Sequence, residues 1–331
     1  MRSKPMISYR MRLHVPLAVQ ASLFLFLVFH SCGSILFAQP LVKIRVSNTG
    51  GISDHMPVAI QAGVYKKHGF DVENILVGSS ATVVQSLLSG EVTFAHVGAP
   101  AVVAAVAAGA NIKIIAVFVN RFGWIFVSAS DIRTAKDLKG KSIAIARIGS
   151  GNEFATREAL KKLNLDPDKD VGLIQVGLTP ARFAALTSGH VQAALVDRTH
   201  ILELPKFGLN VLLDLNDLDV EYAQYALVAR ENTIVENRPT VERFVRAYVE
   251  GIRYYRSEPG VVMGYLRKNY FPKLLDVELR IVYDGLKQSM RENPAPTLGG
   301  IQGIVNSLKG QRGGELDPRR IIDASFFPAV K

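Results

Sequence analysis

Residues 42–51 read VKIRVSNTGG, and residues 141–150 read KSIAIARIGS, with apolar residues and a glycine at matching positions. Two more pairs of blocks align at the same offset of 99 residues: DVENILVGSS (71–80) with DVGLIQVGLT (170–179), and SLLSGEVTFAHVG (86–98) with ALTSGHVQAALVD (185–197). This period is longer than that of a solenoid repeat, which is typically about 20–50 residues. The repeat therefore predicts two lobes of similar build, an arrangement that commonly holds a ligand between the lobes.

Strand and helix patterns alternate within each copy of the repeat. Runs rich in β-branched residues predict strands, and the small or polar residues that follow them predict helix starts. In the first copy, strands are predicted at 42–46, 70–77, 92–97 and 112–119, and helices at 57–67, 81–88 and 101–108. In the second copy, strands are predicted at 142–146, 171–176 and 191–196, and helices at 149–163 and from 180. This alternation predicts an α/β fold in which each lobe is a mostly parallel sheet flanked by helices.

The repeat ends after residue 197, and the rest of the chain has a different pattern. A long amphipathic helix is predicted from residue 238, with more helix at 275–290. The apolar stretches WIFVSAS (124–130) and YALVARE (225–231) are where we expect the chain to cross between the lobes, as a two-strand hinge. The predicted lobes are therefore 41–127 plus 223–331 for the first, and 128–222 for the second.

Residues 1–38 are predicted to be a secretory signal peptide, so the mature protein is expected in the periplasm. They have a basic start without acidic residues, an apolar run, and a small residue, Ala38, at the cleavage point. An uncleaved membrane anchor is the alternative, although the apolar run is short for a span. Cys32, the only cysteine of the chain, leaves a lipid-anchored N-terminus open. Cleavage at Ala38 would leave no thiol for a disulfide, for cysteine ligation of zinc or for a cysteine nucleophile.

The net charge does not indicate a nucleic-acid partner. The formal charge is +10, and removing the four basic residues of the predicted leader lowers it to +6. The remaining surplus is spread along the sequence, which favours a solvated basic surface over nucleic-acid binding. Apolar residues make up 48% of the chain and charged residues 21%, which is an ordinary globular balance. We expect a monomer.

Three stretches resemble a known family. SDHMPVAIQAGVYKKHGFDVENILVGSSATVVQSLLSGEVTFAHVGAP (53–100) combines a polar loop with histidine, a helix ending in a glycine turn, a D-V-E strand, a G-S-S helix start and a G-E-V strand. DLKGKSIAIARIGSGNE (137–153) resembles a second-lobe opening, and LTSGHVQAALVD (186–197) its partner strand. Together they are similar to periplasmic substrate-binding proteins of the sulfonate/taurine/nitrate and thiamine-precursor group, over residues 41–290.

The resemblance implies a two-lobed type II periplasmic-binding-protein fold. It also implies a protein that captures a small anionic or polar molecule and delivers it to the permease of an ABC importer in the inner membrane. Two alternatives remain open: an enzyme of the thiamine-pyrimidine-synthase type, and a ligand-sensing domain for a membrane receptor. The cysteine-rich iron motif of those synthases is absent, as are the G-x-S-x-G, H-E-x-x-H, P-loop and Rossmann motifs. The seven histidines lie far apart, which argues against a metal cluster. With these motifs absent, we expect no catalytic residue, metal or cofactor.

Ligands of open α/β sheets bind beyond the carboxyl ends of the strands. Most of those ends lead into helices here, and the free N–H groups and dipole of a helix start favour anionic or polar atoms. The candidate ligand-binding residues at these ends are Ser53, Asp54, His55, Ser79, Ser80, Gly98, Ala99, Asn120, Arg121, Ser150, Asn152, Thr179 and Asp197. The first loop, with Asp54 and His55, is also where the resembled family places ligand contacts.

The candidates with distinctive chemistry also have a structural interpretation. Arg121 is the best candidate for binding an anion, but it is equally explained as a surface arginine. His55 is also explained as a capping or solvent-facing residue, and Asp197 as a cap for the following segment. Capping alone explains three serines as well as ligand contact does: Ser79, Ser80 and Ser150.

Three residues near the candidates are interpreted mainly as packing residues. His96 lies inside a predicted strand and is expected to be a hydrogen-bonded core histidine. Phe122 and Trp124 are able to stack on a flat ligand, although packing at the junction of the lobes is the commoner role of such rings.

Overall fold

The structure is a computed structural model that describes residues 40–218, 221–308 and 316–328. The predicted signal peptide, with Cys32 and Ala38, lies outside the described residues. The strands of the first sheet are β1 (Val42–Asn48), β2 (Phe70–Leu76), β3 (Phe94–Val97), β4 (Ile112–Val119) and β10 (Tyr225–Arg230). Those of the second sheet are β5 (Trp124–Ser128), β6 (Ser142–Ile145), β7 (Gly172–Gln175), β8 (Ala193–Asp197) and β9 (Asn210–Asp214).

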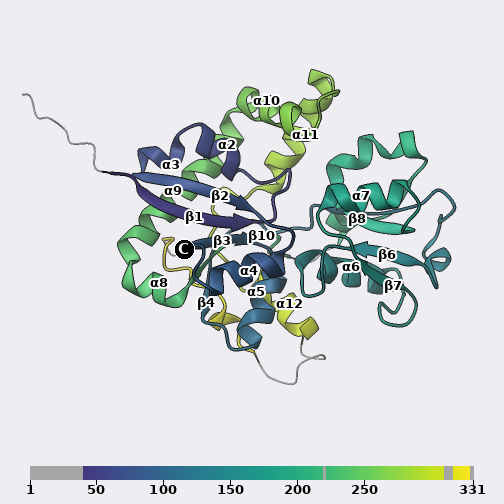
Figure 1. Cartoon of the computed structure of the whole chain (residues 1–331), viewed down its shortest axis with the longest axis horizontal. Coiled ribbons are helices and arrows are strands. Elements are labelled where there is room, and N and C mark those ends of the chain that lie inside the picture. Colours follow the sequence, from purple (N-terminus) through teal and green to yellow (C-terminus); the bar gives the residue numbers. More distant parts are fainter. Residues whose placement is uncertain (1–39, 219–220, 309–315, 329–331) are drawn as a thin grey trace, which may run out of the picture. The chain divides into compact units, whose positions relative to one another are not determined.

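The two sheets have the same strand plan, which confirms the two-lobed α/β fold predicted from the repeat (Figure 1). The first sheet has the order β2-β1-β3-β10-β4, and the second has the order β7-β6-β8-β5-β9. In each sheet the first three strands are parallel, and the fourth is antiparallel to both of its neighbours. Four strands of each sheet therefore point the same way, and their carboxyl ends meet at one edge.

The antiparallel strand of each sheet is the strand by which the chain enters that sheet from the other one. The stretch 124–130, predicted as a crossing, forms β5 and pairs with β8 and β9 inside the second sheet. The stretch 225–231 forms β10, between β3 and β4 of the first sheet. The passages themselves lie before these strands, after Val119 and after Asp214. A central strand is buried on both faces and therefore has a continuous apolar sequence. From the sequence alone, such a strand is not distinguished from a buried connection between the lobes.

Helices cover both faces of the first sheet. The core on one face contains side chains of α4 (Ser80–Leu88), α5 (Ala99–Ala107) and α12 (Gly299–Leu308). The core on the other face contains side chains of α2 (Met56–Gln61), α3 (Val64–Lys67), α8 (Glu231–Glu236), α9 (Arg238–Ser257), α10 (Pro259–Asn269) and α11 (Asp276–Ser289). The predicted amphipathic helix is α9, and its apolar stripe is buried. Among the described residues, no helix has the length and apolar character of a membrane span.

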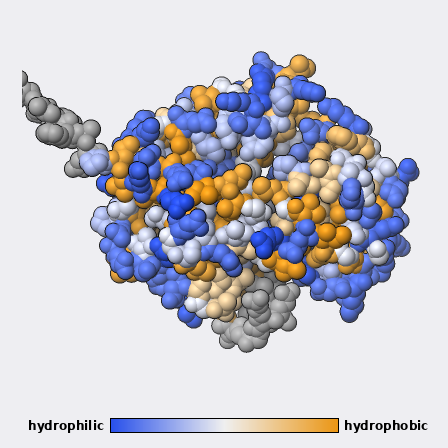
Figure 2. All heavy atoms as spheres, viewed as in Figure 1, coloured by the Kyte–Doolittle hydropathy of each residue, from blue (hydrophilic) through white to orange (hydrophobic). Residues whose placement is uncertain are grey.

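The helices of the second sheet are α6 (Gly151–Lys162) and α7 (Thr179–Thr187). α6 packs in the core that continues from the first sheet, and α7 packs on the opposite face, over Ile125, Ala144 and Val196. On the face shown in Figure 2, hydrophilic residues predominate and hydrophobic residues lie between them, many near the middle.

The sequence misses two features of the helices. The helix predicted at 57–67 is two helices, because Gly63 takes a left-handed conformation (φ 75°) between α2 and α3. Glycine adopts that conformation without steric cost, and the apolar spacing alone did not reveal the break. α10 was not predicted, and its last turn turns out to matter for the site.

Candidate functional site

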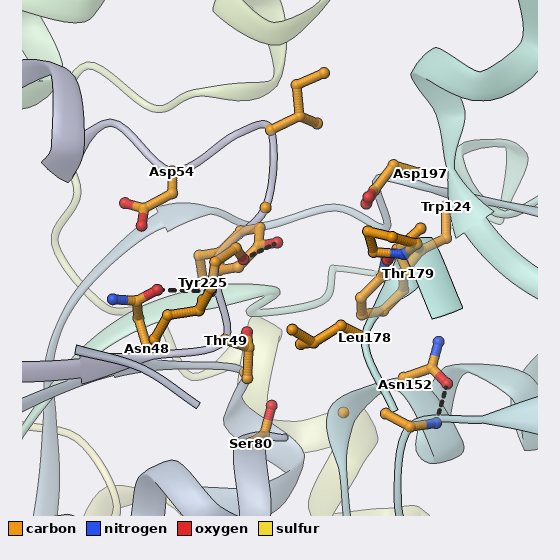
Figure 3. A pocket seen from close by; sticks show the side chains of 18 of the residues that line it. Asn48, Thr49, Asp54, Ser80, Trp124, Asn152, Leu178, Thr179, Asp197 and Tyr225 are labelled. Atoms are coloured by element: carbon orange, nitrogen blue, oxygen red, sulfur yellow. Dashed lines mark hydrogen bonds between the residues drawn. The ribbon is translucent and has the colours of Figure 1, made fainter. Parts of the chain in front are cut away.

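A cavity of about 440 Å³ lies at the carboxyl ends of the strands of both sheets (Figure 3). Eight of the thirteen candidate residues line this pocket: Asp54, Ser79, Ser80, Gly98, Ser150, Asn152, Thr179 and Asp197. Five are absent from its lining: Ser53, His55, Ala99, Asn120 and Arg121. The pocket volume is in the usual range for small-molecule sites.

The serines at the helix starts act as caps and also line the pocket. Ser79 Oγ accepts from the Thr82 N–H at 3.3 Å at the start of α4, and Ser150 Oγ accepts from the Glu153 N–H at 3.2 Å at the start of α6. The hydroxyl of Ser80 makes no hydrogen bond to another described residue. Capping and pocket lining are therefore combined in Ser79 and Ser150, while Ser80 has an uncommitted hydroxyl.

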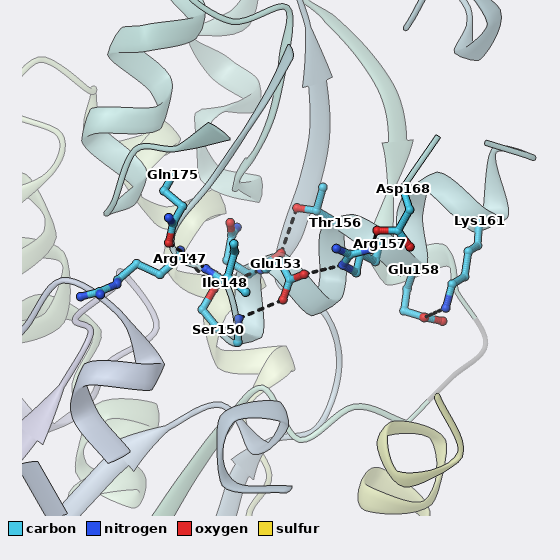
Figure 4. Close-up of polar contacts among 12 residues, drawn as sticks. Arg147, Ile148, Ser150, Glu153, Thr156, Arg157, Glu158, Lys161, Asp168 and Gln175 are labelled. Carbon is cyan, nitrogen blue, oxygen red and sulfur yellow. Dashed lines mark hydrogen bonds and ion pairs between the residues drawn. The ribbon is translucent and has the colours of Figure 1, made fainter. Parts of the chain in front are cut away.

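The start of α6 carries its own negative charge (Figure 4). Glu153 Oε2 accepts from the Gly149 N–H at 3.1 Å, and its other oxygen is paired with Arg157. Arg157 is also 2.7 Å from a carboxylate oxygen of Asp168. A carboxylate in the first turn offsets the positive end of a helix dipole. The anion-binding capacity expected at this helix start is therefore already used in part.

Asn152 offers a donor to the pocket. Its side-chain oxygen accepts from the Ala146 N–H at 2.9 Å, which holds the amide in place. Its Nδ2 is buried and has no partner among the described residues. A buried donor without a partner costs free energy, so a ligand acceptor or a water that reaches Nδ2 would be favourable.

A buried polar cluster lies in the first lobe where the pocket meets α2. Asp54 is 2% exposed; its Oδ1 accepts from the Met56 N–H at 2.9 Å and is 3.3 Å from His96 Nδ1. Burial alone raises the pKa of Asp54, but His96, His55 and the Met56 N–H together hold it below its usual value. Asp54 is therefore an ionised carboxylate at neutral pH.

His55 is fully buried and contacts three aromatic rings, including Phe118 at 4.8 Å and Tyr248 at 4.6 Å between ring centres. It does not face solvent, which contradicts one of the two structural interpretations offered from the sequence. It does occupy the N-cap position of α2, but its side chain makes no cap hydrogen bond. Burial, and next the charge of His96, lower the pKa of His55 to about 3, against a smaller opposing effect of Asp54. His55 is therefore neutral at physiological pH.

Several polar atoms of this cluster have no hydrogen-bond partner among the described residues: Asp54 Oδ2, both ring nitrogens of His55, His96 Nε2, Tyr65 OH and Tyr248 OH. His96 is buried in the core as predicted, but only its Nδ1 faces a partner, so the expectation of a fully hydrogen-bonded histidine is not met. So many unpaired buried atoms are unusual, and they lie directly behind a pocket residue, Asp54.

The arginine that lines the pocket is Arg182, which the sequence did not indicate, and not Arg121. Arg121 is exposed and lies outside the pocket lining, in agreement with its alternative interpretation as a surface arginine. Arg182 lines the pocket but is 3% exposed, and it donates to Leu195 O at 3.1 Å, to Thr179 Oγ1 at 2.9 Å and to Gly177 O. Burial lowers the pKa of Arg182 to about 10, against the opposing effect of Asp197, so it stays charged.

Aromatic rings join the two passages of the chain between the sheets. Phe122, on the first passage, stacks on Tyr222 of the second, with ring centres 4.0 Å apart. The Tyr222 hydroxyl donates to Gly151 O at 3.3 Å, at the start of α6. Phe122 therefore packs at the junction, whereas Trp124, the only tryptophan of the chain, lines the pocket.

Sequence reasoning missed several lining residues. Asn48, Thr49 and Asn74 lie at the ends of β1 and β2, and the rule about strand ends could have included them. Four more come from the last turn of α10 and the residue pair after it: Tyr265, Asn269, Tyr270 and Phe271. These lie in the part of the chain that has no counterpart in the repeat, so the repeat could not indicate them.

Comparison with known proteins supports the same architecture. The family model described as NMT1/THI5 like matches residues 53–261. One similar relative is "Putative binding protein YtlA" of Bacillus subtilis, which is 26% identical over 71% of this chain and 72% of the relative. Another is a protein of Brucella abortus (strain 2308), also named as a putative binding protein, which is 25% identical over 66% of this chain and 68% of the relative.

Solved structures share the fold. The alkanesulfonate-binding protein SsuA from Xanthomonas axonopodis pv. citri has a TM-score of 0.69 at 16% identity, covering 87% of this chain and 98% of its own. The aliphatic sulphonate-binding protein SsuA from Escherichia coli has a TM-score of 0.66 at 19% identity, covering 86% and 98%. The nitrate-binding protein NrtA from Synechocystis PCC 6803 has a TM-score of 0.62 at 16% identity, covering 74% and 70%. At these identities the likeness concerns the fold.

Proposed function

The chain belongs to the NMT1/THI5-like family, and from this premise we propose that it captures a small organic molecule between its two lobes and delivers it to the permease of an ABC importer. The observation that carries the proposal is the pocket, whose lining comes from the strand ends of both sheets. A ligand that touches both lobes stabilises the closed arrangement by its differential affinity for it. Two of the solved structures with the same fold are sulfonate-binding and nitrate-binding proteins.

We propose that the lobes open and close about the two passages between the sheets. The first passage lies between Val119 and Trp124, and the second between Asp214 and Tyr225. The described residues of both passages belong to no strand, and backbone or side-chain hydrogen bonds of Tyr222 and Gln224 join one passage to the other. Hinge motions of this kind need only a few residues to change their backbone angles.

The location and the chemical role are part of the same proposal. An importer that serves a binding protein takes its ligand outside the cytoplasm, which agrees with the predicted signal peptide at 1–38 and a periplasmic location, with lipid anchoring at Cys32 as the alternative. We propose a monomer that binds without catalysis and has no nucleic-acid partner. The curated relatives named as binding proteins support this role.

The first test uses Trp124 as a reporter. Because it is the only tryptophan and lines the pocket, ligand binding is expected to change the tryptophan emission in a saturable way. The protein would be titrated with small sulfonates, nitrate, aminopyrimidines, flavins, and aromatic acids and amines. Small-angle scattering on the complex is expected to show a smaller radius of gyration. A ligand that saturates the emission without compaction, or that is turned over, would contradict the proposal.

A second test holds the lobes apart. A Cβ on Gly151 would lie 3.1 Å from Tyr222 Oη, 3.8 Å from Ser80 Oγ and 3.9 Å from the Gly98 Cα, so α6 of the second lobe approaches the first lobe closely here. Gly151→Val is expected to reduce the compaction seen by scattering and to weaken binding by about tenfold or more, which corresponds to about 1.4 kcal/mol.

The matched control for this test is Gly172→Val in β7, where a Cβ meets other atoms at ordinary contact distances. It adds the same side chain to the same lobe, away from the pocket. Equal compaction and equal affinity in the Gly151 and Gly172 variants would mean that approach of the lobes at Gly151 is not needed for binding.

A further inference from the structure

The charged side chains that line the pocket differ in how many hydrogen-bond and ion-pair partners they already have. Among the described lining residues the acidic ones are Asp54 and Asp197, and Arg182 is the only lysine or arginine. Asp197 is half-buried and occupies the N-cap position of the turn Arg198–Leu202, yet its side chain makes no cap hydrogen bond. It has no ion pair or hydrogen bond with another described residue. Figure 3 shows Asp54 and Asp197 on opposite sides of the pocket.

The positive charge of Arg182 is not available to a ligand in the same way. Its guanidinium is buried and donates to two backbone carbonyls and to Thr179. Three of its five N–H donors are committed to these acceptors and the side chain is only 3% exposed, so a ligand anion has little access to it. A ligand cation meets the carboxylate of Asp197, which has no hydrogen-bond or ion-pair partner among the described residues, although its charge acts on Arg182. Another anion-binding feature, the start of α6, already holds the carboxylate of Glu153, whereas the starts of α4 and α7 have no acidic residue in their first turn.

Aromatic rings supply a second feature that attracts positive charge. Trp124, Tyr225, Tyr265, Tyr270 and Phe271 all line the pocket. The faces of such rings carry negative charge and bind ammonium and related cations, most strongly where water is excluded. The rings come from both lobes and from the end of α10, so a bound molecule would be surrounded by them.

The charges of the two carboxylates, Asp54 and Asp197, act on tyrosines of the pocket lining. Burial raises the pKa of Tyr225, and the charges of Asp197 and Asp54 raise it further. For Tyr270, burial and the neighbouring Tyr265 are followed by the same two carboxylates, which again raise the pKa. A negative field that disfavours ionisation of these hydroxyls also disfavours an anionic ligand.

We propose that the ligand is a small organic cation, with a protonated amine, amidine or ring nitrogen held at Asp197 and an apolar body against the aromatic rings. Asp54, with its unpaired Oδ2 on the other lobe, supplies the second acceptor. This inference rests on the proposed function and names the ligand class of the same pocket. It replaces the anionic ligand expected from the helix starts.

The test compares three molecules of one shape and different charge: benzamidinium, benzamide and benzoate. Their affinities are measured by calorimetry and by the emission of Trp124. We expect benzamidinium to bind at least tenfold more tightly than benzoate. Asp197→Asn is expected to weaken benzamidinium by about tenfold, the scale of one charge-assisted hydrogen bond, and to leave benzamide unchanged. Asp197 makes no hydrogen bond or ion pair with another described residue, and asparagine keeps its shape, so this variant is expected to fold, with some loss of stability because its charge favours the buried Arg182 guanidinium.

The control variant is Asp131→Asn, which removes the same charge from an exposed position of the second lobe that does not line the pocket. It is expected to change none of the affinities. Benzoate binding as tightly as benzamidinium, benzamidinium failing to bind, or an Asp197→Asn protein that keeps the full preference for benzamidinium would each overturn the inference.

Compaction is measured separately, so the two proposals fail in different ways. Benzoate that binds tightly and compacts the protein would overturn the cationic ligand and leave the proposed function intact. Benzamidinium that binds tightly without compaction would support the cationic ligand and contradict closure of the lobes.

Discussion

Replacing Arg182 by alanine is expected to lower the free energy of unfolding by about 3–5 kcal/mol. The guanidinium is buried and ties three acceptors together: Leu195 O on β8, Gly177 O in the loop before α7, and Thr179 Oγ1 in the first turn of α7. Each buried acceptor that loses its donor costs about 1–3 kcal/mol, and a cavity adds to this. Denaturant unfolding at neutral pH, followed by circular dichroism, measures the difference.

Arg121→Ala is the matched control, because it removes the same side chain from an exposed position on the passage between the sheets. Its effect on unfolding is expected to stay within about 0.5 kcal/mol. Arg182→Lys keeps the charge but has no planar fork for three acceptors, so we expect an intermediate loss. If Arg182→Ala were as stable as Arg121→Ala, the hydrogen bonds of Arg182 would not hold α7 on its sheet.

Much of the fold could be predicted because the repeat fixes both topology and turn chemistry. The helices predicted after Gly78 and Gly177 begin at matching positions, Ser80 and Thr179, as the offset requires. Gly50 and Gly149, one offset apart, both adopt left-handed conformations, with φ of 67° and 78°. A residue with a side chain is strained there, so the matching glycines record the same turn in both lobes.

The missed features have a common physical cause: they depend on what lies across the fold rather than next along the chain. Apolar spacing cannot tell a buried central strand such as β5 from a buried crossing. Nor can it show that Arg182 donates to Leu195 O on β8, because that acceptor belongs to a different stretch of sequence. The side chains of Tyr265 and Tyr270 reach the pocket only because α10 packs against the first lobe.

Within the site, strand ends were a better guide than residue chemistry. Asp54, Asn152, Thr179 and Asp197 were chosen because they end strands or begin helices, and all four line the pocket. Arg121 was chosen because it is cationic, and it does not. Position relative to a strand end is set by local pattern, whereas the charge a pocket requires depends on every side chain around it.

The buried His55 predicts a strong dependence of stability on acid. Its pKa is about 3 in the folded protein, against an ordinary value of 6.5. Between these two values the unfolded chain binds a proton at His55 and the folded chain does not. Stability is therefore fully present above pH 6.5 and is lost as the pH falls, at about 1.4 kcal/mol for each pH unit. The lowered pKa of Asp54 acts in the same direction, but only below its ordinary value of 3.8.

In the His55→Phe variant, the free energy of unfolding is expected to fall by about 2–3 kcal/mol less between pH 7.5 and pH 4.5 than in the unaltered protein, because phenylalanine cannot take up the proton. The replacement loses at most a weak contact with the Tyr248 backbone, since neither ring nitrogen of His55 has a well-formed hydrogen bond among the described residues, and it keeps an aromatic ring against Tyr248. Denaturant unfolding at several pH values gives the slope. His190→Gln, at an exposed histidine, is the control and is expected to keep the slope of the unaltered protein. Equal slopes in the unaltered protein and His55→Phe would mean that His55 takes up its proton in the folded state, and that the polar cluster behind Asp54 is open to water.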